Sequence, residues 1–94
     1  MKVIAIESCK NGVLRSYGTG KLLNDMVPDC EPFNKFKIKN PCIKLDSGKY
    51  VWGFQCWWGD EERVRKEYDG VKEIIIEIED EVKPVELFNN GDKK

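Results

Sequence analysis

The sequence predicts a mainly β (α+β) fold, either a five-strand curled sheet or a small, partly open barrel, with one short helix before the last strand. Three observations support this. Asn11-Gly12 separates two strand-like runs, apolar and polar residues alternate in most other segments, and residues 60–69 have the acidic start typical of a short helix. A chain of 94 residues makes one domain. We expect this domain to span residues 1–88 and residues 89–94 to form a disordered tail.

Charge is small in sum but unevenly distributed. The net charge is −1. The first 49 residues hold nine Lys or Arg against five Asp or Glu, and the remaining 45 hold seven against twelve. We expect the basic and acidic halves to pair within the fold or between two copies. No apolar run approaches the roughly 20 residues that span a bilayer, and Glu7 comes too early for a signal peptide. These features predict a cytoplasmic protein with no membrane contact.

The cysteines argue against a metal site. Cys9, Cys30, Cys42 and Cys56 are widely spaced, whereas four-thiolate zinc sites usually bring their ligands in close pairs. We therefore expect no metal and no cofactor, and reduced cysteines of which at least three are structural. The chain has no histidine, the side chain that most often moves protons near neutral pH. The sequence accordingly predicts that the protein is not an enzyme.

The first two strands form a hairpin, because Asn-Gly suits the positive φ angles of a type I′ turn. The expected cross-strand pairs are Lys10 with Val13, Cys9 with Leu14, and Ile6 with Tyr17. Residues 18–21 (Gly-Thr-Gly-Lys) break the second strand. They lack the spacing of a phosphate-binding loop, so they predict a bend or bulge where only glycine fits.

Residues 22–34 form the longest irregular segment and are either functional or packed across the mouth of the barrel. Residues 35–39 alternate strictly, which predicts a strand with Phe36 and Ile38 inward and three lysines outward. Residues 42–45 continue as a strand, and residues 46–48 turn it.

The aromatic stretch 50–58 is expected to be one continuous strand that builds the core. Its core face carries Tyr50, Trp52, Phe54, Cys56 and Trp58. Trp57 lies on the opposite face beside Gly53 and Gln55. It is either covered by helix 60–69 or open to a partner.

The last strand is predicted over residues 71–80. One face carries Ile74, Ile76 and Ile78, and the other carries Glu73, Ile75, Glu77 and Glu79. If this strand neighbours residues 35–39, its glutamates form cross-strand ion pairs with Lys35, Lys37 and Lys39. After Pro84, residues 85–88 add an edge strand or a strap.

This order of elements resembles the Src-homology-3-like small β-barrel superfamily over about residues 2–80, and the glycine-rich bend after Tyr17 resembles the turn of the related KOW modules. The resemblance implies a curled five-strand sheet closed by a short helical segment before strand five, with loop 22–34 beside a ligand groove. An open sheet with one helix packed on it is the alternative architecture.

The function expected is that of a small non-enzymatic module acting by protein–protein interaction, as an adaptor or an inhibitor of phage or mobile-element type. The expected contact surface combines exposed aromatic residues with adaptable neighbours from loop 22–34. Its members are Trp57, Tyr17, Met26, Phe33 and Gln55. The opposed charges of the two halves add a homo-oligomer as a further expectation.

Two alternatives involve phosphate. Trp57 stacks on a nucleotide or another small ligand while basic side chains hold its phosphate, or the lysine stripe binds single-stranded nucleic acid. The residues expected to make these contacts are Arg15, Lys21, Lys35, Lys37 and Lys39. An acidic pI of about 5.5 makes nucleic acid the less favoured partner.

Overall fold

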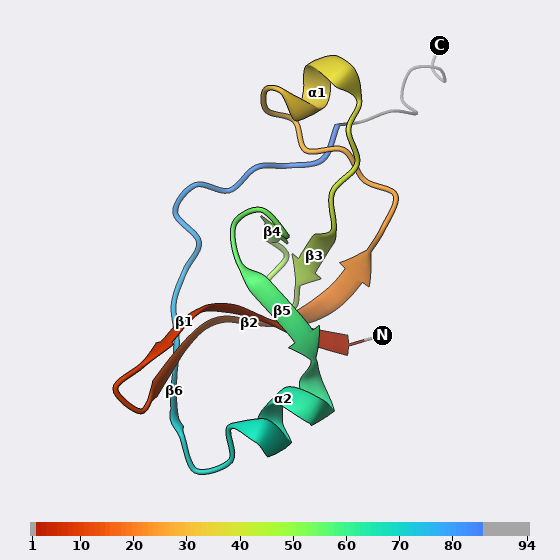
Figure 1. Cartoon of the computed structure of the whole chain (residues 1–94). Coiled ribbons are helices and arrows are strands. Elements are labelled where there is room, and N and C mark those ends of the chain that lie inside the picture. The colour runs from red at the N-terminus through yellow and green to blue at the C-terminus, as the bar shows by residue number, and fades with distance from the viewer. Residues whose placement is uncertain (1, 86–94) are drawn as a thin grey trace.

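The computed structural model describes residues 2–85 (Figure 1). These form a single open, mainly antiparallel sheet with short helices, which confirms the predicted fold class. The strands are β1 (Lys2–Lys10), β2 (Val13–Leu23), β3 (Cys42–Leu45), β4 (Tyr50–Trp52), β5 (Trp57–Asp60) and β6 (Lys72–Ile75), and the helices are α1 (Phe33–Phe36) and α2 (Glu61–Glu67). The predicted tail and most of segment 85–88 lie outside the described residues.

The sheet is organised around β2. The strand order is β4-β3-β2-β1-β5, and β6 pairs in parallel with β2. One edge of β2 is shared, because its residues 20–23 pair with β3 and its residues 13–16 pair with β6. Since β5 and β6 both run parallel to β2, β5–α2–β6 is a crossover connection through a helix, as parallel strands require. β6 lies within the predicted last strand, but its parallel pairing with β2 was not predicted; the sixth strand arises because the predicted strand 50–58 is two strands, β4 and β5.

The predicted hairpin is confirmed, with one change of register. Lys10 pairs with Val13 and Cys9 with Leu14, as expected, but Ile6 pairs with Ser16 instead of Tyr17. The shift is local, because Glu7 of β1 and Tyr17 of β2 both lack a partner, and the expected register returns where Ala5 pairs with Gly18 (φ +102°). This bulge lies just before residues 18–21, the segment expected to bend or bulge. Those four residues pair regularly with residues 2–5, and the strand continues to Leu23.

Gly20 allows β3 to approach β2 closely. A Cβ atom at this position would clash with the backbone oxygen of Lys44 and would lie 2.8 Å from the Cα of Leu45. Both neighbours are backbone atoms, so a side chain cannot be accommodated without separating the strands. The glycine is required by the packing of the sheet and not by a phosphate ligand.

Each face of the sheet has its own hydrophobic cluster. The first contains Val3, Ala5, Ile43, Leu45, Val51 and Ile78. The second contains Ile4, Ile6 and Leu14 with Val64 of α2, and Tyr68 packs against it. The Asp60 carboxylate caps α2 by accepting a hydrogen bond from the Arg63 N–H at 3.2 Å. The predicted helix is thus confirmed, with its apolar side on β1 and β5.

The aromatic stretch is two strands and not one. β4 ends at Trp52, residues 53–55 turn, and β5 begins at Trp57. The turn is held because the Trp52 N–H donates to Gln55 Oε1 at 3.0 Å and the Gln55 N–H donates to the Trp52 carbonyl at 2.8 Å. Trp52 is fully buried as predicted, but Phe54 is 45% exposed. The assignment of Phe54 to the core was wrong, because side-chain alternation does not continue through a turn.

Residues 35–39 are not a strand either. α1 and the left-handed Lys37 (φ +53°) occupy this segment, and Phe36 and Ile38 are exposed instead of inward. The expected ion pairs with the last strand are absent among the described residues. Lys39 pairs with Asp25, Glu73 with Arg65, and Glu77 with Lys49. Of the ion pairs within residues 2–85, only Lys49–Glu77 joins the basic half to the acidic half.

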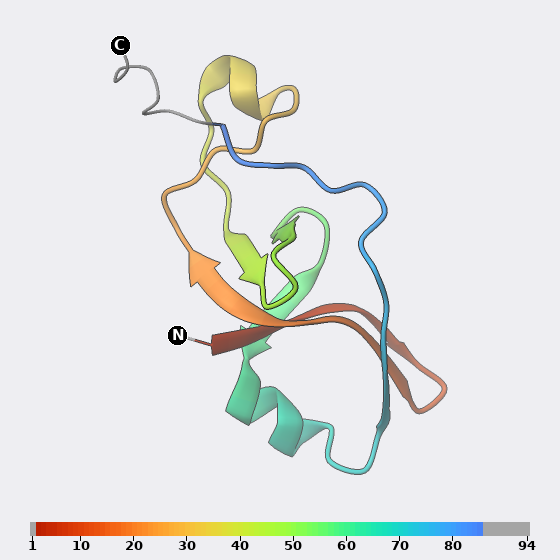
Figure 2. The same ribbon diagram turned by 180° about the vertical axis from the view of Figure 1, so that it is seen from behind.

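The predicted last strand stops at Ile75, and residues 76–85 continue as an extended segment, called the strap below (Figure 2). The strap passes the free edge of β4. The Trp52 indole N–H donates to the Val82 carbonyl, and the Tyr50 N–H donates to the Glu81 carboxylate at 3.1 Å. Ile78 is buried as predicted, whereas Ile74 is 38% exposed. No helix within residues 2–85 has the length and hydrophobicity to cross a membrane.

Candidate functional site

The candidate site is built on α1, which stands apart from the sheet in Figures 1 and 2. We call it the aromatic lobe and define it by four apolar and three basic residues. They are Phe33, Phe36, Ile38 and Phe54 with Lys35, Lys37 and Lys39. No residue of α1 is buried, although two of its four residues are phenylalanines.

Local hydrogen bonds fold the lobe. The Asn34 N–H donates to the Cys30 carbonyl at 2.9 Å, and the Ile38 N–H donates to the Phe33 carbonyl at 3.0 Å. Lys37 ends the helix in the left-handed conformation, which breaks the strand that the alternating sequence suggested. The helix is too short to be stable alone, so it depends on these bonds and on one aromatic contact.

That contact joins the lobe to the turn after β4. The rings of Phe33 and Phe54 stack with centroids 4.8 Å apart and planes 19° apart. Phe54 reaches this position because the Gly53 N–H donates to the Pro41 carbonyl at 2.8 Å, which fixes the turn beside the lobe. The turn that interrupts the aromatic stretch therefore presents Phe54 at the surface.

The outer surface of the lobe is apolar with basic neighbours. Phe36 is 66% exposed and Ile38 is 43% exposed. The Lys35 ammonium lies 5.9 Å from the centre of the Phe36 ring, a cation–π distance. Lys39 pairs with Asp25 at 3.3 Å, but both side chains are mostly exposed, so this pair is weak and open to exchange.

Two polar atoms in this region lack partners. Within the described residues, the buried side-chain oxygens of Asn34 and Asn40 accept no hydrogen bond.

A second group of predicted residues lines an acidic groove of about 780 Å³ between the bulge of β2 and the strap. Its lining includes Arg15, Tyr17 and Gln55 together with Glu7, Glu77, Glu79 and Asp80. Hydrogen bonds from the Ser8 hydroxyl and from Arg15 Nε (3.0 Å) hold the pKa of Glu7 below its ordinary value. Arg15 is therefore already paired, and its surroundings repel phosphate.

Tyr17 is protonated in this groove. Burial and then the nearby charge of Glu7 raise the pKa of the Tyr17 phenol. The Gln55 amide donates to the Asp80 carbonyl at 3.2 Å, which ties the turn after β4 to the strap. The structure thus brings Tyr17 and Gln55 together, as the expected partner surface required.

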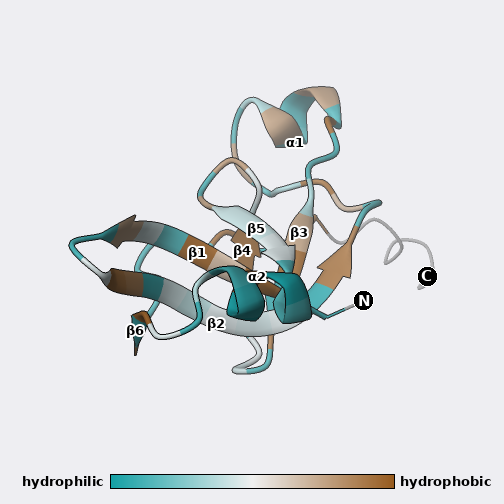
Figure 3. Cartoon of the chain, turned by 60° about the horizontal axis from the view of Figure 1, so that its bottom comes forward, coloured by the Kyte–Doolittle hydropathy of each residue, from teal (hydrophilic) through white to brown (hydrophobic). Residues whose placement is uncertain are grey.

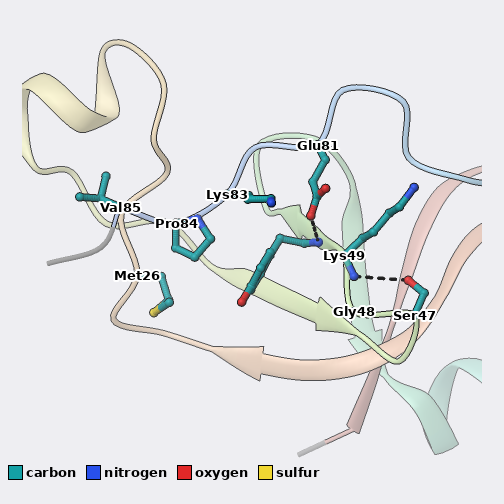
Figure 4. Close-up of a pocket in the computed structure, with 9 residues that line it drawn as sticks. Met26, Ser47, Gly48, Lys49, Glu81, Lys83, Pro84 and Val85 are labelled. Atoms are coloured by element: carbon teal, nitrogen blue, oxygen red, sulfur yellow. Dashed lines mark hydrogen bonds between the residues drawn. The ribbon is translucent and has the colours of Figure 1, made fainter. Parts of the chain in front are cut away.

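Met26 lies elsewhere, in a pocket of about 510 Å³ between the β3–β4 turn and the strap (Figure 4). Tyr50, Pro84 and Val85 give the pocket apolar walls, and Lys49, Glu81 and Lys83 lie around it. The Glu81 carboxylate is engaged by the Tyr50 N–H. Lys21 lies in a further depression with Lys2 and Asp46, which form an ion pair at 2.9 Å.

Trp57 is only partly covered. Its side chain is 43% exposed, and its ring lies 6.3 Å from the ring of Tyr68 at the end of α2. The helix therefore leaves much of Trp57 open. The predicted contact residues are distributed over five places. Only two groups are gathered: Arg15, Tyr17 and Gln55 in the acidic groove, and Phe33 with the lobe lysines.

Sequence reasoning missed Phe36, Ile38 and Phe54, all assigned to the core. One available signal was the placement of residues 33–40 between Pro32 and Pro41, since prolines disfavour a central strand.

The thiols and carboxylates offer little chemistry. All four cysteines are free, and burial raises the pKa of Cys42 to about 12 and that of Cys56 to about 11. These two thiols therefore stay protonated near neutral pH and are poor nucleophiles. Within residues 2–85, no group of three or more cysteine or acidic side chains is arranged to hold a metal ion.

Comparisons with family models, with curated proteins and with solved structures found no match to this chain. The function is therefore argued from the surface itself.

Proposed function

We propose that the protein is a small non-enzymatic binding module that holds another protein against the aromatic lobe. The observation that carries this proposal is the exposure of Phe36, Ile38 and Phe54 on a helix and a turn that contribute little to the core. Exposed aromatic side chains are typical of protein-binding surfaces, where aromatic residues are enriched. Docking of a partner covers these side chains and removes their apolar surface from water.

The lysines of the lobe define the chemistry of the partner. Lys35 and Lys37 flank Phe36, and among the described residues neither is in an ion pair. A segment with an apolar side chain between carboxylates matches this arrangement, since the carboxylates meet the lysines at the rim. The proposed partner is therefore a protein that offers an acidic segment with large apolar side chains.

A displayed library of random peptides, selected on the immobilised protein, tests this proposal. We expect the recovered peptides to combine Asp or Glu with Leu or aromatic residues. Phe36→Ala should weaken their binding at least about tenfold, which corresponds to about 1.4 kcal/mol. Lys37→Glu should weaken it further in low salt, because it reverses a charge at the rim.

Ile75→Ala is the matched control, because Ile75 lies on β6 and is exposed to a similar degree (69%). It should leave peptide affinity unchanged. Recovery of basic peptides, or of peptides that bind Phe36→Ala as tightly as the original protein, would contradict the proposal.

Single-stranded nucleic acid is the second candidate. The Lys35 ammonium beside the Phe36 ring pairs a cation with a surface on which a base can stack. Titration with oligothymidine at low salt distinguishes the two candidates. Binding that falls steeply with added salt and with Phe36→Ala would favour nucleic acid. If no binding is seen, the protein partner remains the favoured candidate.

We also propose that the module acts in the cytoplasm. Four free cysteines, of which Cys9 is exposed, fit a compartment that keeps thiols reduced. Alkylation of intact cells before lysis tests this, because the exposed Cys9 thiol will be modified completely if its compartment keeps it reduced.

A further inference from the structure

Within residues 2–85, no strand pairs with the outer edge of β4, which is the last strand at its end of the sheet. The Lys49 carbonyl and the Gly53 N–H, on either side of β4, each form a backbone hydrogen bond of 2.8 Å toward the β3 side. Alternation along the strand therefore directs the N–H and C=O groups of Tyr50 and Trp52 outward. Outward groups without partners are a template for a strand of another chain.

Acceptors and donors of this same chain take the place of a strand at that edge. The Trp52 N–H donates to Gln55 Oε1 at 3.0 Å, and the Trp52 carbonyl accepts from the Gln55 N–H at 2.8 Å. The Tyr50 N–H donates to the Glu81 carboxylate of the strap at 3.1 Å (Figure 4). Three of the four outward groups are thus satisfied without a second strand. A carboxylate also opposes an incoming strand, because it cannot donate to that strand's carbonyl groups.

The strap is fixed beside β4 by contacts that do not involve the Glu81 side chain. Directly before Glu81, the Asp80 carbonyl accepts from the Gln55 amide at 3.2 Å. Directly after it, the Val82 carbonyl accepts from the Trp52 indole N–H. The half-buried carboxylate of Glu81 is therefore held toward β4 from both sides. Removal of this carboxylate alone should leave the strap in place.

We propose that the strap is a built-in cover for the β4 edge, in which the Glu81 carboxylate replaces the missing strand at Tyr50. The cover keeps this edge from pairing with a second copy of the chain. The opposite edge strand, β5, is arranged differently, since it leads directly into α2, a helix that is mainly hydrophilic (Figure 3). The cover does not depend on the function proposed for the aromatic lobe.

Hydrogen exchange of single backbone amides, followed by NMR, tests the cover. Glu81→Ala removes the acceptor, so we expect the Tyr50 amide to exchange at least about tenfold faster than in the unmodified protein. The Trp52 amide is bound to Gln55 and should keep its rate, which reports that β4 is still folded. Glu81→Gln retains an acceptor oxygen and should restore most of the protection of Tyr50.

Glu79→Ala is the matched control. It removes the same charge from an exposed strap residue that lines the acidic groove instead of facing β4. It should leave the exchange of Tyr50 unchanged. Sedimentation over a range of protein concentration then measures the consequence for association. Glu81→Ala should associate more than the unmodified protein, whereas Glu81→Gln and Glu79→Ala should not.

Unchanged exchange of Tyr50 in Glu81→Ala would overturn the proposal. An equal increase in Glu79→Ala would also overturn it, because the effect would then be one of charge and not of the hydrogen bond. If Trp52 exchanges faster together with Tyr50, β4 itself has opened, and Glu81 is not a cover. If Tyr50 alone exchanges faster and Glu81→Ala associates no more than the unmodified protein, the carboxylate satisfies β4 without guarding it, which overturns the proposal as well.

Discussion

The surroundings of Trp52 and the aromatic lobe use the same kind of residue in opposite ways. Trp52 is fully buried at the end of β4, and its indole N–H reaches the Val82 carbonyl of the strap. Phe36, on α1, is 66% exposed. The two aromatic residues lie 16 positions apart in the sequence. The difference shows that an aromatic residue stabilises this fold only where the sheet provides neighbours for it.

In the comparison of the sheet with the aromatic lobe, we expect Trp52→Ala to cause the largest loss of stability. Truncation of a buried tryptophan removes apolar contacts and leaves a cavity, so we expect the unfolding free energy to fall by about 3 to 5 kcal/mol. Urea denaturation followed by circular dichroism measures this. A loss below about 1 kcal/mol would mean that the sheet can close over the space, and the contrast with the lobe would fail.

Within the sheet, Gly20→Ala tests the close contact between β2 and β3. The new methyl group would meet backbone atoms of Lys44 and Leu45, which cannot rotate away as a side chain can. We expect a loss of about 1 to 3 kcal/mol in the unfolding free energy. Lys21→Ala, on the exposed neighbour in the same strand, should change stability little. Equal effects of the two substitutions would contradict the steric argument.

Cys42 gives the stability of the sheet a pH dependence. Burial raises the pKa of this thiol from 9.0 to about 12 in the folded protein, so the folded state holds the proton more tightly than the unfolded state. Stability from this group is complete below pH 9 and declines as pH rises from 9 towards 12. Between pH 9 and 10 we expect a loss of about 1 kcal/mol.

Denaturant titrations at the two pH values measure this loss. Cys42→Ala supplies the control, since it should reduce the pH dependence while Cys56, whose pKa burial raises to about 11, retains a part. An unchanged slope in the alanine variant would assign the effect to other groups.

Phe36→Ala should have the smallest effect on stability and the largest on binding. The ring is mostly exposed, so we expect the unfolding free energy to change by about 0.5 kcal/mol or less. The melting temperature, compared with that of Trp52→Ala, tests the contrast directly. A large destabilisation would show that Phe36 supports α1 and would weaken its assignment as a contact residue.

Local chemistry made part of the fold predictable. Asn11-Gly12 indicated the hairpin, residues 46–48 the turn after β3, and the acidic start of residues 60–69 the helix α2, because each depends on residues close in sequence. The pairing of β6 with β2 was not predictable in this way. It joins Ser16 to Glu73, 57 positions apart, through a hydrogen bond of 2.7 Å.

The candidate site was predicted only in part for the same reason. Phe33 and the lobe lysines were named, but alternation at residues 35–39 predicted a strand, whereas local hydrogen bonds and the contact of Phe33 with Phe54 hold a helix there. Phe33 meets Phe54 only because a turn interrupts the aromatic stretch. Phe54 is exposed because of that turn, and the alternation of side chains along a strand does not predict where a turn interrupts the strand.

We expect the β1–β2 hairpin to form before β6 joins the sheet. The β1–β2 hairpin closes through a turn at Asn11-Gly12, so little chain entropy opposes its early formation. β6 pairs with β2 across more than fifty intervening residues, so we expect this pairing to form late in folding. We expect folding kinetics to show Leu14→Ala slowing folding and Ile74→Ala mainly speeding unfolding, and the reverse result would exclude this order. Until β6 pairs with them, residues 13–16 of β2 form an uncovered strand edge in every newly made chain.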